Sequence, residues 1–151
     1  MNCDYILKLK RGCAFVPCYV KGLGKVTKIY YIDGGCDFLP YSISKVLNDY
    51  CAINMRCLKS IKALCKDVTG RKNIVPLYIK EEGVFLPVKT IKPCTRGDGC
   101  IGYINTNYIK EIDFDSRSII LNNGAVLNYL DGRETLKKRM GDCSIISKKI
   151  V

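Results

Sequence analysis

The side chains best suited to chemistry in this 151-residue chain are its ten cysteines. Thiols form disulfides, ligate metals or act as nucleophiles, and their spacing and neighbours help to decide among these uses. The closest pairs are separated by four or five residues, and none forms the Cys-x2-Cys knuckle that is common in zinc sites. The cysteines are Cys3, Cys13, Cys18, Cys36, Cys51, Cys57, Cys65, Cys94, Cys100 and Cys143.

Two interpretations of these thiols stay open, namely reduced apolar side chains and a zinc site. Five disulfides would suit a secreted protein, but the N-terminal sequence MNCDYILKLKRG lacks the apolar segment of a signal peptide. We therefore expect a cytoplasmic protein whose reduced thiols pack as small apolar side chains, with no cofactor. A zinc site made of four cysteines is the alternative, and it would make the chain a cysteine-rich metal-binding or protein-interaction module.

Catalytic motifs are weak in this sequence. The chain has no histidine, so the usual general base and the usual partner of a nucleophilic cysteine are both missing. The stretch KGLGKVT is similar to a phosphate-binding loop, but the required pattern fails at Tyr19 and at Val26. We expect a protein that is not an enzyme.

The charge of the chain favours a polyanionic partner. There are 25 basic and 14 acidic residues, which gives a formal net charge of +11. An excess that serves only solubility is the plain alternative. The candidate DNA-binding residues are Arg56, Lys59, Lys62, Lys66, Arg71, Lys72, Lys89, Lys92 and Arg96.

The elements that must position these residues follow from hydrophobic periodicity and turn residues. We predict an α+β fold in one domain over residues 1–151, mostly of antiparallel strands. Residues 1–41 and 74–130 are expected to be β-rich, beginning with a strand at YILKLK. Residues 42–69 are expected to be helical, with Ser42 as an N-cap. Asp131 is expected to cap a short helix over 132–140 with Lys137, Lys138 and Arg139 in its last turn, and SIISKKIV to fray or add an edge strand.

The clearest helical pattern runs from Ile53 to Thr69, followed by Gly70 in the usual C′ position. At roughly 100° per residue, its apolar side chains fall on one arc and its cations on the opposite arc. A helix face of only cations repels itself, whereas mixed charges are usual. Contact with phosphates is one interpretation, and a solvated face is the other. The apolar set is Cys57, Leu58, Ile61, Leu64, Cys65 and Val68, and the cationic set is Arg56, Lys59, Lys62 and Lys66.

The block from Pro76 to Gly124 resembles the central part of the ComK family, the competence transcription factors of Firmicutes. The order and spacing of several short features carry the resemblance: a Pro-apolar strand, a strand that ends near Phe-x-Pro, a basic loop, a Cys before a Gly-aromatic-Ile strand, and an Asn-Gly hairpin. It covers residues 50–130 well and 1–50 loosely. The matching residues are Pro76, Phe85, Pro87, Cys100, Gly102, Tyr103, Ile104, Ile109, Ile120, Asn123 and Gly124.

This resemblance implies a sequence-specific activator that binds AT-rich duplex DNA as a dimer or tetramer, largely from the minor groove. The loop from Lys89 to Arg96 would then be a basic finger in a narrow, strongly negative groove. An ordinary exposed loop, a LytTR-like DNA-binding domain, and an RNA or single-strand binder are the alternatives.

The loop generates a prediction. Arg96→Ala should reduce the preference for AT-rich over GC-rich duplex, because a guanidinium loses less hydration than an ammonium on entering a narrow groove. Paired binding titrations on the two duplexes at fixed salt measure this preference. An equal loss on both duplexes would make Arg96 a phosphate contact only.

Overall fold

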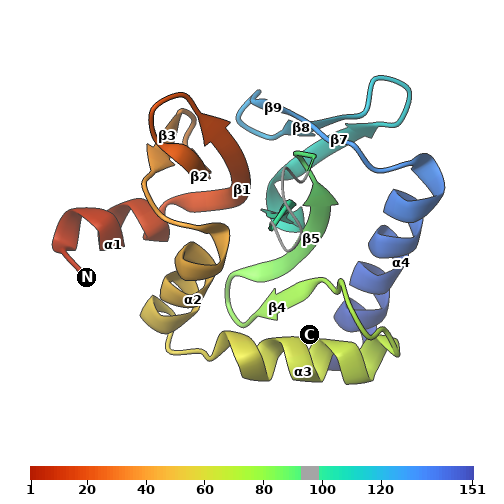
Figure 1. Cartoon of the computed structure of the whole chain (residues 1–151). Coiled ribbons are helices and arrows are strands. Elements are labelled where there is room, and N and C mark those ends of the chain that lie inside the picture. The colour runs from red at the N-terminus through yellow and green to blue at the C-terminus, as the bar shows by residue number, and fades with distance from the viewer. Residues whose placement is uncertain (93–98) are drawn as a thin grey trace.

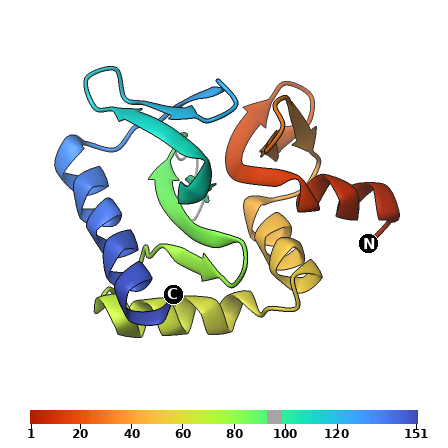
Figure 2. The same cartoon turned by 180° about the vertical axis from the view of Figure 1, so that it is seen from behind.

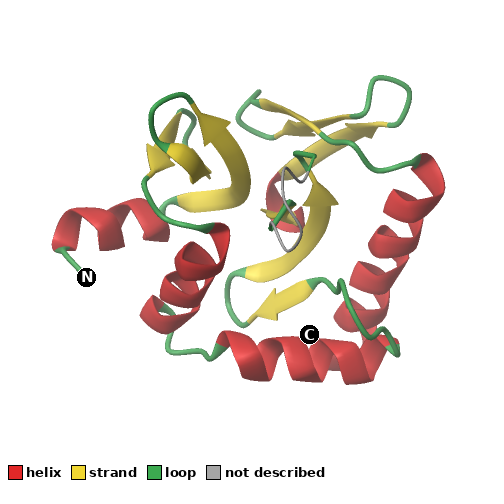
Figure 3. Cartoon of the chain, viewed as in Figure 1, coloured by secondary structure: helices red, strands yellow, loops and turns green. Residues whose placement is uncertain are grey.

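The computed structural model describes residues 1–92 and 99–151 (Figures 1 and 3). Every strand pairing is antiparallel, so the predicted α+β class is confirmed. In chain order the elements are α1 (Cys3–Lys10), β1 (Gly12–Val20), β2 (Gly24–Tyr31), β3 (Cys36–Leu39), α2 (Ile43–Ile53), α3 (Leu58–Thr69), β4 (Leu77–Ile79), β5 (Gly83–Lys89), β6 (Ile101–Asn105), a 3-10 turn (Thr106–Tyr108), β7 (Ile109–Asp113), β8 (Ser118–Leu121), β9 (Val126–Asn128) and α4 (Arg133–Ile150).

The larger sheet has six strands in the order β3-β2-β1-β6-β5-β4, and the smaller has the order β7-β8-β9. The pairing of β1 with β6 joins the two strand-rich parts of the sequence in one sheet, with Ala14 opposite Ile104. This junction is tight at Gly102, where an added Cβ would lie 2.6 Å from Val16 Cγ1 and 3.0 Å from its Cα. The absence of a side chain at Gly102 is therefore required by packing.

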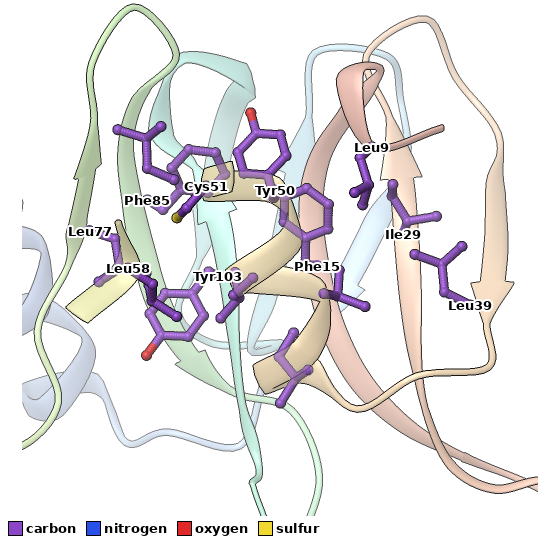
Figure 4. Packing of buried hydrophobic residues seen from close by; sticks show 14 of the residues in the cluster. Leu9, Phe15, Ile29, Leu39, Tyr50, Cys51, Leu58, Leu77, Phe85 and Tyr103 are labelled. Carbon is purple, nitrogen blue, oxygen red and sulfur yellow. The ribbon is translucent and has the colours of Figure 1, made fainter. Parts of the chain in front are cut away.

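Helices α1 and α2 and the start of α3 cover one face of the six-stranded sheet. Their buried side chains meet an aromatic group in which the rings of Phe15 and Tyr50 are 4.7 Å apart and those of Tyr50 and Phe85 are 5.7 Å apart. Figure 4 shows Tyr50 and Phe15 near the middle of this cluster, with Leu58 and Leu77 on one side and Leu9 and Ile29 on the other. The two aromatic pairs are tilted and edge-to-face, with interplanar angles of 53° and 66°, and such pairs add stabilisation beyond their area burial.

The small sheet and α4 cover the opposite face. Val84, Leu86 and Ile104 point to this side and pack with residues of β8 and α4, including Ile119 and Leu136. Figure 2, seen from behind, shows α4 along one side of the molecule and α3 along its lower end. Since both faces are covered, the central strands carry nearly continuous apolar sequence, as in VFLPV of β5.

The predicted first strand was wrong, because residues 3–10 form helix α1. The alternating pattern of YILKLK also contains the helical pair Tyr5 and Leu9, and both are buried on the core. The Asn2 side chain accepts a hydrogen bond from the Tyr5 backbone N–H at 2.8 Å and caps the helix. Capping and the four-residue spacing outweigh the two-residue alternation here.

The helical region 42–69 is divided in two. The Ser42 cap is confirmed, as is the left-handed Gly70 that ends α3. The second helix begins at Leu58 and not at Ile53, because the chain turns at Met55, which has a φ of 58°. Arg56 therefore lies in the connection and not on the helix.

The C-terminal helix is longer than predicted and contains residues 133–150. Gly141 does not end it, and SIISKKIV continues it instead of fraying or adding a strand. The cause is tertiary: Leu136, Cys143 and Ile146 are buried at helical spacing against the sheets. Asp131 is not its cap, since Gly132 holds that position.

Two glycines test this account of the fold with opposite signs. Gly102→Ala should lower the free energy of unfolding by about 1–3 kcal/mol, because the new methyl group overlaps Val16. Gly141→Ala should raise it by up to about 1 kcal/mol, because Gly141 is an exposed helix-interior position with open space around it. Urea unfolding of both variants measures the two changes. A neutral Gly102→Ala would contradict the close β1–β6 junction.

Candidate nucleic-acid interface

Three of the candidate lysines share one flank of α3. At roughly 100° per residue, Lys59, Lys62 and Lys66 fall within an arc of about 60°. Lys59 is exposed, whereas Lys62 and Lys66 are half-buried, so their aliphatic stems lie along the protein. In the part of the chain that the structure describes, no carboxylate lies within ion-pair distance of these three lysines. The row is therefore an uncompensated positive surface.

The apolar arc of α3 is narrower than predicted. Leu58 and Cys65 are buried, but Leu64 is 49% exposed and Cys57 is exposed. The helix meets the core through Leu58 at its start and Cys65 near its end, so Leu64 falls beside the contact and not within it. The lysines consequently flank the buried stripe instead of lying directly opposite to it.

A polar pocket of about 280 Å³ opens where α3 ends and its following loop meets α4. Of its two predicted residues, Arg71 is already paired: its guanidinium donates to both carboxylate oxygens of Asp142, at 3.0 and 3.2 Å. Lys72 is exposed and has no such partner among the described residues. Arg71 therefore anchors α4, whereas Lys72 is available to a ligand.

The opposite wall of this pocket comes from α4, through Thr135, Lys138 and Arg139. Arg139 donates to the Asp131 carboxylate at 2.7 Å, and both side chains are largely buried. With both arginines neutralised by aspartates, Lys72 and Lys138 supply the net positive charge. The sequence placed Lys138 in the last turn of a short C-terminal helix, and Lys138 was not among the candidate DNA-binding residues. The basic run KKR at residues 137–139 was the feature of the sequence that could have indicated this position.

The other side of Asp131 fixes the base of the predicted basic loop. Its second carboxylate oxygen accepts the Lys89 backbone N–H at 2.7 Å, and the Lys89 carbonyl accepts the Leu130 N–H at 2.7 Å. The Lys89 side chain is half-exposed and Lys92 is exposed. Arg96, with residues 93–98, lies outside the described residues. Among the described residues, the start of this loop and the α3 lysines therefore do not line a common site.

The nine described cysteines are free thiols. Burial raises the pKa of Cys13 and Cys51 to about 11 and that of Cys143 to about 12, so these groups stay neutral in the core. Cys57 differs: the polar backbone and side-chain groups of Ser60, in the first turn of α3, lower the pKa of its exposed thiol. Among the described residues, no group of three or more cysteine or acidic side chains is arranged to hold a metal ion.

Comparisons with family models, curated proteins and solved structures find no match to this chain. Within residues 1–92 and 99–151, no helix has the length and apolar character needed to cross a bilayer.

The buried pair beside the pocket generates a stability prediction. Arg139→Met should lower the free energy of unfolding by about 3–5 kcal/mol, because it leaves the buried Asp131 carboxylate without its cation. The matched control is Lys138→Met, an exposed neighbour without an ion pair in the described structure, which should change it by less than about 0.5 kcal/mol. Guanidinium unfolding of both variants distinguishes them. Equal effects would contradict the structural role of Arg139.

Proposed function

We propose that this chain binds double-stranded DNA and acts as a transcription regulator, with α3 and the adjacent polar pocket on the phosphate backbone. The observation that supports this most is the row of Lys59, Lys62 and Lys66, which lacks acidic partners among the described residues. The same positive character continues after the helix with Lys72, and across the pocket with Lys138. A polyanion would supply the missing counter-charge.

The dimensions of the row suit a backbone contact. From Lys59 to Lys66 the helix rises by about 10 Å, so the three ammonium groups can meet more than one phosphate of a strand. Lysine is a flexible point charge, and such contacts position a protein on a duplex without reading its sequence. In this proposal α3 and the pocket therefore contribute to the affinity for DNA and not to the preference for a particular sequence.

Sequence preference, in this proposal, belongs to the segment from Lys89 onward. The resemblance to ComK proteins is the support for AT-rich sites, for activation of transcription and for a dimer or tetramer. The anchoring of Lys89 by Asp131 and Leu130 provides a fixed base from which such a segment starts.

A single-stranded nucleic acid is the second candidate, and one observation favours it. The side chain of Phe38 is 52% exposed, and the Lys28 ammonium lies 5.7 Å from its ring centre and 4.9 Å from that of Tyr30. Exposed aromatic rings beside cations can stack on unpaired bases. Competition between duplex and single strand of the same sequence separates the two candidates.

The backbone contact is tested by salt dependence. The logarithm of the duplex association constant should fall with the logarithm of salt concentration, with a slope of about −0.9 for each phosphate contact. Lys62→Ala and Lys66→Ala should each weaken binding to AT-rich and GC-rich duplex equally, and should each flatten this slope by about one. Fluorescence anisotropy titrations at several salt concentrations measure both quantities.

Lys21→Ala is the matched control, since it removes the same charge from the β1–β2 turn. Figures 1 and 2 place β1 and β2 in the upper part of the molecule and α3 along its lower end. The slope should therefore stay unchanged in this variant. Equal losses for Lys21→Ala and Lys62→Ala would show only a general effect of charge, and an absence of duplex binding would refute the proposal.

A further inference from the structure

A second pocket, of about 430 Å³, lies on another side of α4, between this helix, β5 and β7. Its volume falls within the roughly 300–1,000 Å³ that is usual for small-molecule sites. None of the α4 residues that line the polar pocket lines this one. It is therefore separate from the proposed DNA contact and needs its own explanation.

The floor of this pocket is apolar. Leu86 from β5 is almost fully buried beneath it, and Ile109 and Ile112 from β7 with Met140 from α4 are half-buried around it. These three half-buried side chains pack on the core cluster and keep apolar surface directed to the pocket. An occupant with an apolar body would remove that surface from water.

The rim of the pocket is polar and carries one charge. Thr106 and Ser144 already donate their hydroxyls to the backbone carbonyls of Val84 and Met140. The side chains of Ser147 and Lys148, both exposed, make no hydrogen bond or ion pair with the residues that the structure describes. Among the described residues, the lining contains no acidic side chain, and the unpaired ammonium of Lys148 is its only ionic group.

We propose that this pocket binds a small apolar carboxylate. The hydrocarbon body lies against Leu86, Ile109, Ile112 and Met140, and the carboxylate meets the Lys148 ammonium and the Ser147 hydroxyl. A cation and a hydroxyl at one end of an apolar pocket match an amphipathic anion, because each end of the ligand then finds its own environment. A neutral apolar ligand would make no ion pair with Lys148.

The three methionines provide a direct readout in the chain without DNA. Met140 lines the pocket, whereas Met1 and Met55 are exposed elsewhere, at 62% and 84%. Octanoate is the probe, and octanol is its neutral counterpart. In a protein with carbon-13-labelled methionine methyl groups, octanoate should shift the Met140 resonance saturably and leave those of Met1 and Met55 in place.

Matched variants assign the two ends of the ligand. Lys148→Met keeps the aliphatic stem and should weaken octanoate binding about tenfold, which corresponds to 1.4 kcal/mol. Lys149→Met removes the neighbouring exposed charge, which does not line the pocket, and should leave the affinity unchanged. Ser147→Phe, a change at an exposed rim position, should fill the mouth of the pocket and abolish the Met140 shift, with an unchanged circular dichroism spectrum as the check of folding.

Three outcomes would overturn the proposal: no response of Met140, parallel shifts of all three methionines, or equal affinity for octanoate in Lys148→Met and Lys149→Met. Tighter binding of octanol than of octanoate would also overturn it, since the site would then be apolar without selecting the carboxylate. Because every measurement is made without nucleic acid, these outcomes are independent of whether the chain binds DNA.

Discussion

The position of α4 depends on two buried carboxylates in a chain whose formal charge is +11. Asp142 and Asp131 are 3% and 4% exposed, and each is paired with one arginine. A buried carboxylate without a cation costs several kcal/mol, so Arg71 and Arg139 are held where the aspartates need them. Hence the loop after α3 and the end of β5 are both fixed to α4. The arginines are neutralised by these pairs, and the positive potential of the polar pocket comes from Lys72 and Lys138.

The six-stranded sheet imposes the second constraint, since it must be covered on both faces. Alternate residues of β5 enter different clusters: Phe85 joins the aromatic group under α2, and Val84 and Leu86 face α4 and the small sheet. Neither cluster contains the α3 lysines, although α3 contributes Leu58 to one cluster and Cys65 to the other. Thus the basic row is located at one end of the sheet, where both layers meet a helix that is only partly buried.

Much of this fold is predictable from local pattern, and the exceptions have physical reasons. The strand signals around GVFLPV and CIGYIN, the Ser42 and Gly70 caps, and the Asn-Gly turn at Gly124 all act within a few residues. Helix α1 was mistaken for a strand because YILKLK fits both periods, and the Asn2 cap decides the outcome. The length of α4 depends on the packing of its buried side chains against the sheets, and Arg71 pairs with Asp142 across 71 residues. Local sequence pattern reveals neither of these contacts. For the same reason Lys138 was not recognised as a pocket residue.

The two pockets on α4 differ in chemistry because the helix presents different residues to each. Thr135, Lys138, Arg139 and Asp142 line the polar pocket, and Met140, Cys143, Ser144, Ser147 and Lys148 line the apolar one. Met140 directly follows Arg139, whose guanidinium is bound to Asp131 and through it to the base of the Lys89 segment. Since Asp131 also accepts the Lys89 backbone N–H, the positive pocket and the start of the basic segment depend on the same helix position.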